Sequence, residues 1–447
     1  MAGAFTLERL FARPLGSDVI AALALGSVVV WALSTTFAAV AIEVGLRVAA
    51  APTPRSAARA TLAGACAATA LWLVALVALV APAGLWADAL LPPVAAAQLV
   101  DYATSIAPGL LFVLIEAVLA QASFASLDGR APVRASIASA SVSSLALFVA
   151  SFLELGAAGF GAATTLGAAA ACWSYGWGPG SALSASELRA ALRDAPVWRP
   201  WRAAGATILS AAPIVGEKAA LSAGYVVFTA WVGRLGAPSL AAHAALVSVG
   251  TVGCLLPEAL ATAASALAAR HRAAGLDVRL LERTALALSV ALALGVASAS
   301  WLARGALLPL FVDEPAGHLA ESAFLAFVAL QVPMAVAIVG RALLRAERRA
   351  HVAFFVALLG GIVVRLPLTA IALATGAGLA GVWTAVLVDW LAQAVGVLGL
   401  RSAGPALRRA RRDPDEPSPV RGLTPPSGAA IRGAWQVFTG VASSQRR

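Results

Sequence analysis

Acidic side chains stand inside long apolar stretches of this sequence, where an ionised group is costly. An ionised side chain at the centre of a bilayer costs roughly 2.5–3.5 kcal/mol on insertion scales, so such a residue usually faces a cavity or a partner. A carboxyl group taken out of water can hold a proton near neutral pH, and an ionised one beside freed backbone carbonyls can hold Na⁺. The carboxylates that qualify as candidate ion-binding groups are Glu43, Glu116, Glu217, Glu258 and Asp389.

Each of these carboxylates also has a purely structural interpretation. Glu43 and Arg47 are four residues apart, so they can form an ion pair near the membrane interface. Asp389 and Arg365 lie on the last two expected helices and can pair with each other. For Glu116, in the middle of an apolar run, an ion-binding role and a structural role both stay open.

Glu217 and Glu258 are the two candidates for a Na⁺ site. Glu217 is adjacent to Lys218, so the two side chains point in different directions around a helix, and Glu217 can face the bundle while Lys218 reaches lipid head groups. Glu258 follows Pro257, and a proline kink exposes backbone carbonyls beside the carboxylate. The sequence does not separate H⁺ from Na⁺, and it indicates no other cofactor.

The elements that carry these residues must be membrane helices. The 447-residue chain is 60% hydrophobic and 12% charged, with a mean hydropathy of +0.86, whereas soluble domains are about half apolar and about a quarter charged. Apolar runs long enough to cross roughly 30 Å of hydrocarbon as helices recur along it. The expected helices are 17–48, 60–84, 97–124, 132–154, 158–178, 206–232, 238–268, 283–305, 321–344, 352–374 and 378–400.

The arginines predict how the chain is oriented. Between the expected helices they fall in alternate loops, and the opposite loops hold only Arg234 and Arg304. By the positive-inside rule the basic loops and the C-terminus face the cytoplasm, which predicts a multi-pass protein of the plasma membrane, in bacteria the inner membrane. The net charge of +10 therefore orients the protein, and we expect no nucleic-acid partner. The basic loops are marked by Arg47, Arg55, Arg59, Arg130, Arg134, Arg189, Arg193, Arg199, Arg202, Arg270, Arg272, Arg279, Arg283, Arg341, Arg345, Arg348 and Arg349.

Two kinds of chemistry find no support in the sequence. The three cysteines, Cys66, Cys172 and Cys254, lack metal-binding spacing and predict neither a disulfide framework nor a metal centre. The chain contains no HExxH or GxSxG motif and no acidic pair in a long loop. We therefore expect a protein that is not an enzyme.

An internal repeat organises the chain. At a constant offset of 220 residues, Leu15-Gly16 corresponds to Leu235-Gly236 and the glycine-rich run 156–161 to 376–381. The repeat predicts an all-α polytopic membrane protein with two pseudo-symmetric helical lobes of five and six helices, related by an axis along the membrane normal. The second lobe has a first helix that the first lobe lacks, so we expect that a first helix is missing from this chain. The expected parts are an N-terminal lobe at 1–178, a cytoplasmic connector at 179–205, a C-terminal lobe at 206–400 and a disordered cytoplasmic tail at 401–447.

The Leu-Gly corner of the second lobe begins a helix. Gly236 lets the backbone turn, and Pro238 fits the first helical turn, where its missing N–H costs nothing. His243, almost two turns further on, is expected to be a hydrogen-bonded packing residue.

These segments together resemble one transporter family. Pro213 and Glu217, the corner at 235–236 and the Ala-Ala-His at 241–243 are similar to the seventh and eighth helices of the multidrug and toxic compound extrusion (MATE) family. The family's other marks are resembled by DGRAP at 128–132, LFVDEP at 310–315, VRLPL at 364–368 and GLAGVWTAVLVDW at 378–390. The chain departs from the family in lacking a first helix, which in many members supplies an acidic residue implicated in proton coupling.

The resemblance implies a cation-coupled antiporter that exports amphiphilic drugs or toxic metabolites by alternating access, driven by H⁺ or Na⁺. The expected partners are membrane lipid and small amphiphilic substrates, cationic ones among them, and we expect a monomer. The alternatives are a flippase for a lipid-linked saccharide and a transport-inactive scaffold. A flippase needs several cationic side chains in its cavity to hold a pyrophosphate, and only Lys218 and Arg365 are available for that role.

Overall fold

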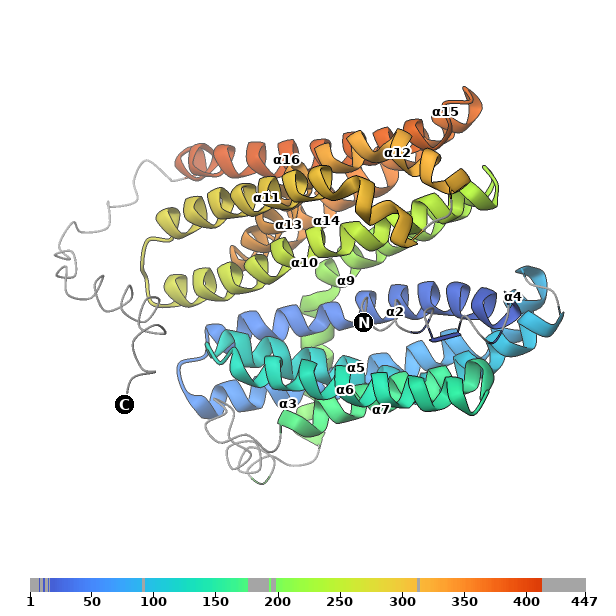
Figure 1. The fold of residues 1–447 in the computed structure, drawn as a ribbon. Helices are drawn as coiled ribbons and strands as arrows, with labels where there is room; N and C mark the ends of the chain where they lie inside the picture. Colours follow the sequence, from blue (N-terminus) through green and yellow to red (C-terminus); the bar gives the residue numbers. More distant parts are fainter. Residues whose placement is uncertain are drawn as a thin grey trace, which may run out of the picture. The chain divides into compact units, whose positions relative to one another are not determined.

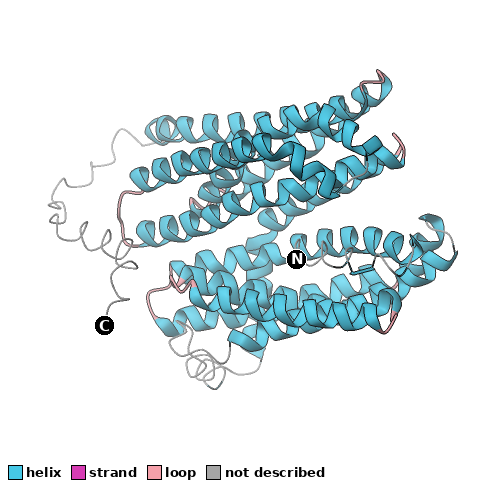
Figure 2. Cartoon of the chain, viewed as in Figure 1, coloured by secondary structure: helices cyan, strands magenta, loops and turns pink. Residues whose placement is uncertain are grey.

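The computed structural model describes residues 8, 11–12, 15, 17–90, 93–175, 193, 198–311 and 314–411. Within these residues every regular element is a helix (Figure 2). Eight helices are long and apolar enough to cross a membrane, or nine if the pair 316–329 and 331–346, bent by 46°, is one span; this count covers only the described residues. The prediction of an all-α multi-pass membrane protein is confirmed.

The first group of helices, here the N-terminal lobe, packs around its long central helix. It consists of α2 (Ser17–Ala49), α3 (Pro54–Val80), α4 (Ala83–Leu90), α5 (Pro93–Ala125), α6 (Arg130–Phe152) and α7 (Gly156–Tyr175). Helix α5 contacts each of the others, and α6 packs along α7 (Figure 1).

The second group, here the C-terminal lobe, follows the same order along the chain. It consists of α10 (Ala237–Ala273), α11 (Arg279–Phe311), α12 (Glu314–Ala329), α13 (Gln331–Ala346), α14 (Ala350–Leu358), the π-helix η2 (Leu359–Val364), α15 (Arg365–Ala374) and α16 (Gly378–Arg411). Helix α13 contacts α10, α11 and α14 and forms the core of this lobe.

The structure carries the 220-residue repeat in its element boundaries. Helix α2 begins at Ser17 and α10 at Ala237, and α6 begins at Arg130 and α14 at Ala350. A glycine in the left-handed region stands where the last helix of each lobe begins: Gly156, with φ +60°, is the first residue of α7, and Gly376, with φ +68°, lies two residues before α16. A side chain would be strained there, which explains why glycine occurs at both repeat positions.

Helix α9 (Trp198–Gly233) lies between the lobes (Figure 1). Its first half packs on α2 and α3, where Ala204 and Ala211 share a cluster with Val40 and Ala67. Its later half contacts α14, η2 and α15. One continuous helix therefore touches both lobes.

Small residues let the helices approach one another closely. A Cβ added to Gly109 of α5 would lie 2.5 Å from Oγ1 and 2.9 Å from Cα of Thr165 in α7. In lipid, where hydrophobicity drives little association between helices, such close van der Waals packing is a main source of stability. The alanine and glycine content thus serves close helix contact.

The two lobes contact each other at one end. The last turns of α2 and α5 share a core cluster with the last turns of α10, through residues such as Val44, Ala122, Ala264 and Ala268. The loops that follow these three helices are the arginine-flanked ones, predicted to be cytoplasmic. The lobe contact therefore lies on the side with the basic loops.

Several expected boundaries were wrong in detail. Helix α9 begins at Trp198, eight residues before the expected start at 206, and the connector at 179–205 stays a prediction. The expected helix 321–344 is two helices that meet at Leu330, and 352–374 contains the π-helical segment 359–364. The first two turns of α9 contain polar and aromatic residues and no long apolar run, so hydropathy predicted a later start for this helix. Most of the connector and the tail from residue 412 lie outside the described residues.

Candidate functional site

Glu217 is held between two arginines in the interior of the protein. Its side chain is 1% exposed, and Nη1 of Arg345 lies 2.8 Å from each carboxylate oxygen. Nε of Arg341 lies 3.1 Å from Oε1 of the same carboxylate. The two arginines are one turn apart on α13, so both reach the same point on α9. The expectation that Glu217 faces the bundle is confirmed.

The positions of Arg341 and Arg345 correct the loop assignment made from the sequence. Both were expected in a basic loop, yet their side chains are only 4% and 8% exposed, inside α13. From sequence alone, arginines are expected at the water interface, because moving a guanidinium group into lipid costs free energy. Here a buried glutamate from a distant helix offsets that cost.

The ionic contacts continue from Arg341 into the last helices. Nη1 of Arg341 donates to Oε1 of Gln393, and Nε2 of Gln393 donates to Oδ1 of Asp389 at 2.6 Å. Nε of Arg365 donates to Oδ2 of Asp389 at 2.7 Å. The pairing of Asp389 with Arg365 is confirmed. Glu217 and Asp389 thus belong to one polar network, defined here by Glu217, Arg341, Arg345, Arg365, Asp389 and Gln393.

The π-helix stands beside this network. At Gly360, inside η2, an added Cβ would collide with the side chains of Asp389 and Gln393. Isolated π-helical turns occur frequently at functional sites, because the extra residue re-aims the side chains that follow. In this chain Arg365, the residue directly after η2, is the one that pairs with Asp389.

A pocket of about 120 Å³ opens beside Glu217, between the two lobes. Lys218 and Glu258 face each other there, with Nζ and Oε1 3.6 Å apart. The side chain of Glu258 is 48% exposed, and that of Lys218 is 19% exposed. Lys218 therefore contacts a carboxylate, where head groups were expected. The lining residues are Ile42, Gln121, Glu217, Lys218, Glu258, Ala261, Thr262, Ser265, Ile338, Arg341, Ala342 and Arg345.

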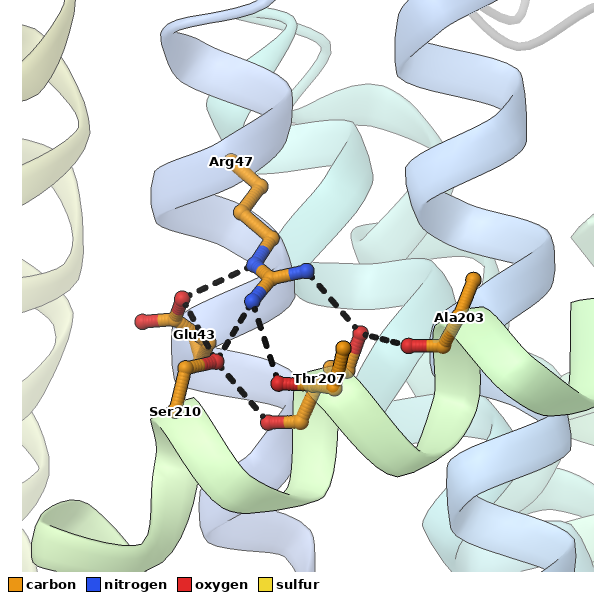
Figure 3. A network of polar contacts seen from close by, with 6 residues as sticks. Glu43, Arg47, Ala203, Thr207 and Ser210 are labelled. Atoms are coloured by element: carbon orange, nitrogen blue, oxygen red, sulfur yellow. Dashed lines mark hydrogen bonds and ion pairs between the residues drawn. The ribbon is translucent and has the colours of Figure 1, made fainter.

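A second polar cluster joins α2 to the first half of α9 (Figure 3). Nε of Arg47 donates to Oε1 of Glu43 at 2.8 Å, which confirms the expected pair. The guanidinium also donates to Oγ1 of Thr207 at 3.1 Å and to Oγ of Ser210 at 2.5 Å. Oγ of Ser210 donates to Glu43 at 3.1 Å. These four residues are called the α2–α9 clamp below.

Two further acids lie within the N-terminal lobe. Glu116 accepts a hydrogen bond of 3.4 Å from the Tyr175 hydroxyl. Glu8, which lies before the first expected helix and was not among the candidate carboxylates, is 1% exposed. It accepts hydrogen bonds from Thr164 at 2.5 Å and from Tyr102 at 3.3 Å. The only sequence signal for it is the apolar residues around it in TLERLF.

His243 packs against aromatic rings. Its ring centroid lies 5.3 Å from that of Phe228 and 5.6 Å from that of Trp383. Neither ring nitrogen has a hydrogen-bond partner in the described part of the chain. His243 is thus a packing residue, but the expected hydrogen bond is wrong.

The contacts of Glu217 bear on how its carboxylate could bind a cation. No group of three or more His, Cys, Asp or Glu residues that could hold a metal ion occurs among the described residues. The Glu217 carboxylate is engaged by two arginines, so a Na⁺ ion there would have to displace a guanidinium. A Na⁺ site near Glu217 and Glu258 stays a prediction.

Comparison with known proteins gives a match to one family model and a shared fold. Residues 213–371 match the MatE family model. No curated protein matches the chain significantly. An outward-facing multidrug resistance MATE transporter of the MOP superfamily is similar to it with a TM-score of 0.79 and 15% identity, covering 91% of this chain and 93% of that one.

Two further solved structures share the fold. The eukaryotic MATE transporter AtDTX14 has a TM-score of 0.80 and 17% identity, covering 91% of this chain and 93% of that one. A MOP superfamily transporter from Pyrococcus furiosus, described as having a binding pocket of reverse polarity, has a TM-score of 0.73 and 16% identity, covering 91% and 92%. The TM-scores and the shares of each chain that are covered establish a common fold.

Proposed function

We propose that this chain exports small amphiphilic compounds by antiport against H⁺ or Na⁺, and the MatE match over residues 213–371 together with the MATE fold supports this proposal. The observation that supports this best is the polar network that begins at the pocket between the lobes. A cation that binds one of its carboxylates removes the partner of an arginine. The arginine must then find another partner, and helix packing changes with it.

Glu217 is the proposed centre of this coupling. It connects α9, which touches both lobes, to α13 in the core of the C-terminal lobe. One charge that moves through about 100 mV supplies roughly 2.3 kcal/mol, which corresponds to a gradient of roughly fifty-fold in substrate. Glu258, Glu116, Glu43 and Asp389 remain further candidates for ion coupling.

Efflux of ethidium from energised cells that lack their own pumps tests the proposal. We expect cells with this chain to clear the dye, and Glu217→Gln to reduce the rate at least about tenfold, because the amide cannot balance two guanidinium groups. The control is Glu321→Gln, which makes the same change at an exposed position of α12. If no form exports the dye while each is present in the membrane, drug export is refuted, and the flippase and the transport-inactive scaffold are the two remaining alternatives.

The coupling ion is tested in the same cells. Replacement of external Na⁺ by choline should stop efflux if Na⁺ drives it, and a protonophore at constant Na⁺ should stop efflux if H⁺ does. Efflux that survives both treatments together would contradict cation-coupled antiport.

A second candidate function gains from the structure. The flippase alternative was disfavoured because only two cationic side chains were available within the helices. Arg341 and Arg345 add two more, both buried, and both line the pocket. Movement of a labelled polyprenyl-pyrophosphate saccharide across vesicle membranes by the purified chain would favour this alternative over drug export.

A further inference from the structure

The pocket between the lobes carries more positive than negative charge. Its ionisable lining residues are three cations, Lys218, Arg341 and Arg345, and two carboxylates, Glu217 and Glu258. The remainder of the polar network is balanced, because Arg365 pairs with Asp389. One positive charge is thus left without a counterion among the described residues around the pocket. In a low-dielectric setting such a charge is costly, and a bound anion would neutralise it.

Arg345 is placed to meet that anion. Its side chain is 8% exposed and lines the pocket. Only Nη1 contacts Glu217, while the buried Nε–H has no acceptor in the described part of the structure. An unsatisfied buried donor costs free energy, and a guanidinium presents its donors as a planar fork that fits a carboxylate or phosphate.

The size and lining of the pocket limit what fits. A volume of about 120 Å³ is below that of sites for drug-sized ligands, so the pocket holds a headgroup and not a whole amphiphile. Gln121, Thr262 and Ser265 offer neutral polar groups, and Ile42, Ala261 and Ile338 offer apolar surface.

We propose that this pocket binds the oxyanion headgroup, carboxylate or phosphate, of an amphiphilic molecule whose apolar part lies outside it. Arg345 makes the main contact, and Lys218 contributes a second charge from the facing helix. Glu217 is then an internal competitor, since it occupies the same guanidinium. The inference concerns binding and holds whether or not the chain exports drugs.

The competition gives two variants with opposite effects. Arg345→Gln removes the binding group, so anion affinity falls. Glu217→Gln removes the competing carboxylate and raises the excess positive charge, so anion affinity rises. If the substitutions merely disrupted the fold around the pocket, anion affinity would fall in both variants.

The experiment uses the full chain in nanodiscs of phosphatidylcholine and calorimetric titration. The probes share one chain length: decanoate, decyl phosphate, decanol and decyltrimethylammonium. We expect both anions to bind at least about tenfold more tightly than the other two, Arg345→Gln to cost at least about tenfold, and Arg345→Lys to cost less. Arg234→Gln, which removes an exposed arginine from the turn that follows α9, is the matched control and should leave the affinity for all four probes unchanged.

Equal binding of decanoate and decanol would overturn the proposal, as would a loss of anion affinity in Glu217→Gln. The same titration in nanodiscs that contain phosphatidylglycerol identifies the source of the headgroup. If that lipid suppresses decanoate binding, a membrane lipid is the occupant. If it does not, a free amphiphile is, and either result supports an oxyanion site.

Discussion

At the scale of single residues, Glu217 and Asp389 each pair with arginine from another helix. Glu217 joins α9 to α13, and Asp389 joins the last helix to the start of α15. Buried pairs of this kind add little net stability compared with apolar packing, but the loss of one partner is expensive. They therefore fix which helices pack together.

Asp389→Asn should destabilise the protein. The substitution leaves Arg365 buried without a counter-charge, which costs about 3–5 kcal/mol for a broken buried pair. Thermal unfolding of the purified protein in detergent measures the change. Asp101→Asn, at an exposed position of α5, is the control and should leave the melting temperature unchanged. Equal melting temperatures for both variants would contradict a structural role for the pair.

The sequence predicted pairs that lie close along the chain better than those that lie far apart. Glu43 and Arg47 share a helix face four residues apart, so their pairing follows from helix geometry. Glu217 and Arg345 are 128 residues apart, and nothing in one sequence joins them. The arginines were therefore assigned to a loop, and the network they complete was missed.

At the scale of elements, closeness between helices depends on particular glycines. Gly109 faces the backbone of α7 at Thr165. A side chain added at position 109 would meet that backbone, which cannot move aside as a flexible side chain could. Gly295, in the middle of α11, has open space around it. The two positions offer a matched comparison within long helices.

Gly109→Ala should destabilise, whereas Gly295→Ala should not. The added methyl group at 109 would lie 2.9 Å from Cα of Thr165 and push α5 from α7. At 295 the same change only removes the helix-weakening effect of glycine, a gain of roughly 0.5–1 kcal/mol. Thermal unfolding of both proteins in the same detergent gives the comparison. A lower melting temperature for Gly295→Ala than for Gly109→Ala would refute the close-packing argument.

Hydropathy predicted which segments form helices, but it did not predict where a helix is interrupted. Each of the eleven expected helices has a counterpart, because an apolar run of about 20 residues in lipid has few options other than a helix. The bend at Leu330 and the π-helix at 359–364 interrupt two of the expected helices. An apolar run predicts that a helix forms, but it does not predict where that helix bends or changes its hydrogen-bond pattern.

At the scale of the whole molecule, α9 makes contacts with both lobes. The α2–α9 clamp and the alanine cluster hold its first half to the N-terminal lobe. The pocket, by contrast, is lined from both lobes, with Gln121 on one side and Ala261 on the other. Lobe movement should therefore open the pocket and leave the clamp closed.

Cross-linking distinguishes these two contacts. In a background with Cys66, Cys172 and Cys254 replaced by serine, we expect a short bismaleimide link between Arg47→Cys and Thr207→Cys to leave dye efflux largely intact. The same link between Gln121→Cys and Ala261→Cys should stop efflux, because it ties the lobes across the pocket. Each cysteine alone, treated with the reagent, is the control. Loss of efflux at the clamp alone would reverse this assignment.

The lining of the pocket also records ancestry. Ile42 and Thr262 are equivalent positions of the repeat, and so are Gln121 and Arg341; all four residues line the same pocket. In a parent with identical halves, each pair would have been one residue that faced its own copy. The pocket thus lies where the two halves of the repeat meet. Part of its positive charge comes from a difference between the halves, because the first half has the amide of Gln121 where the second has the guanidinium of Arg341.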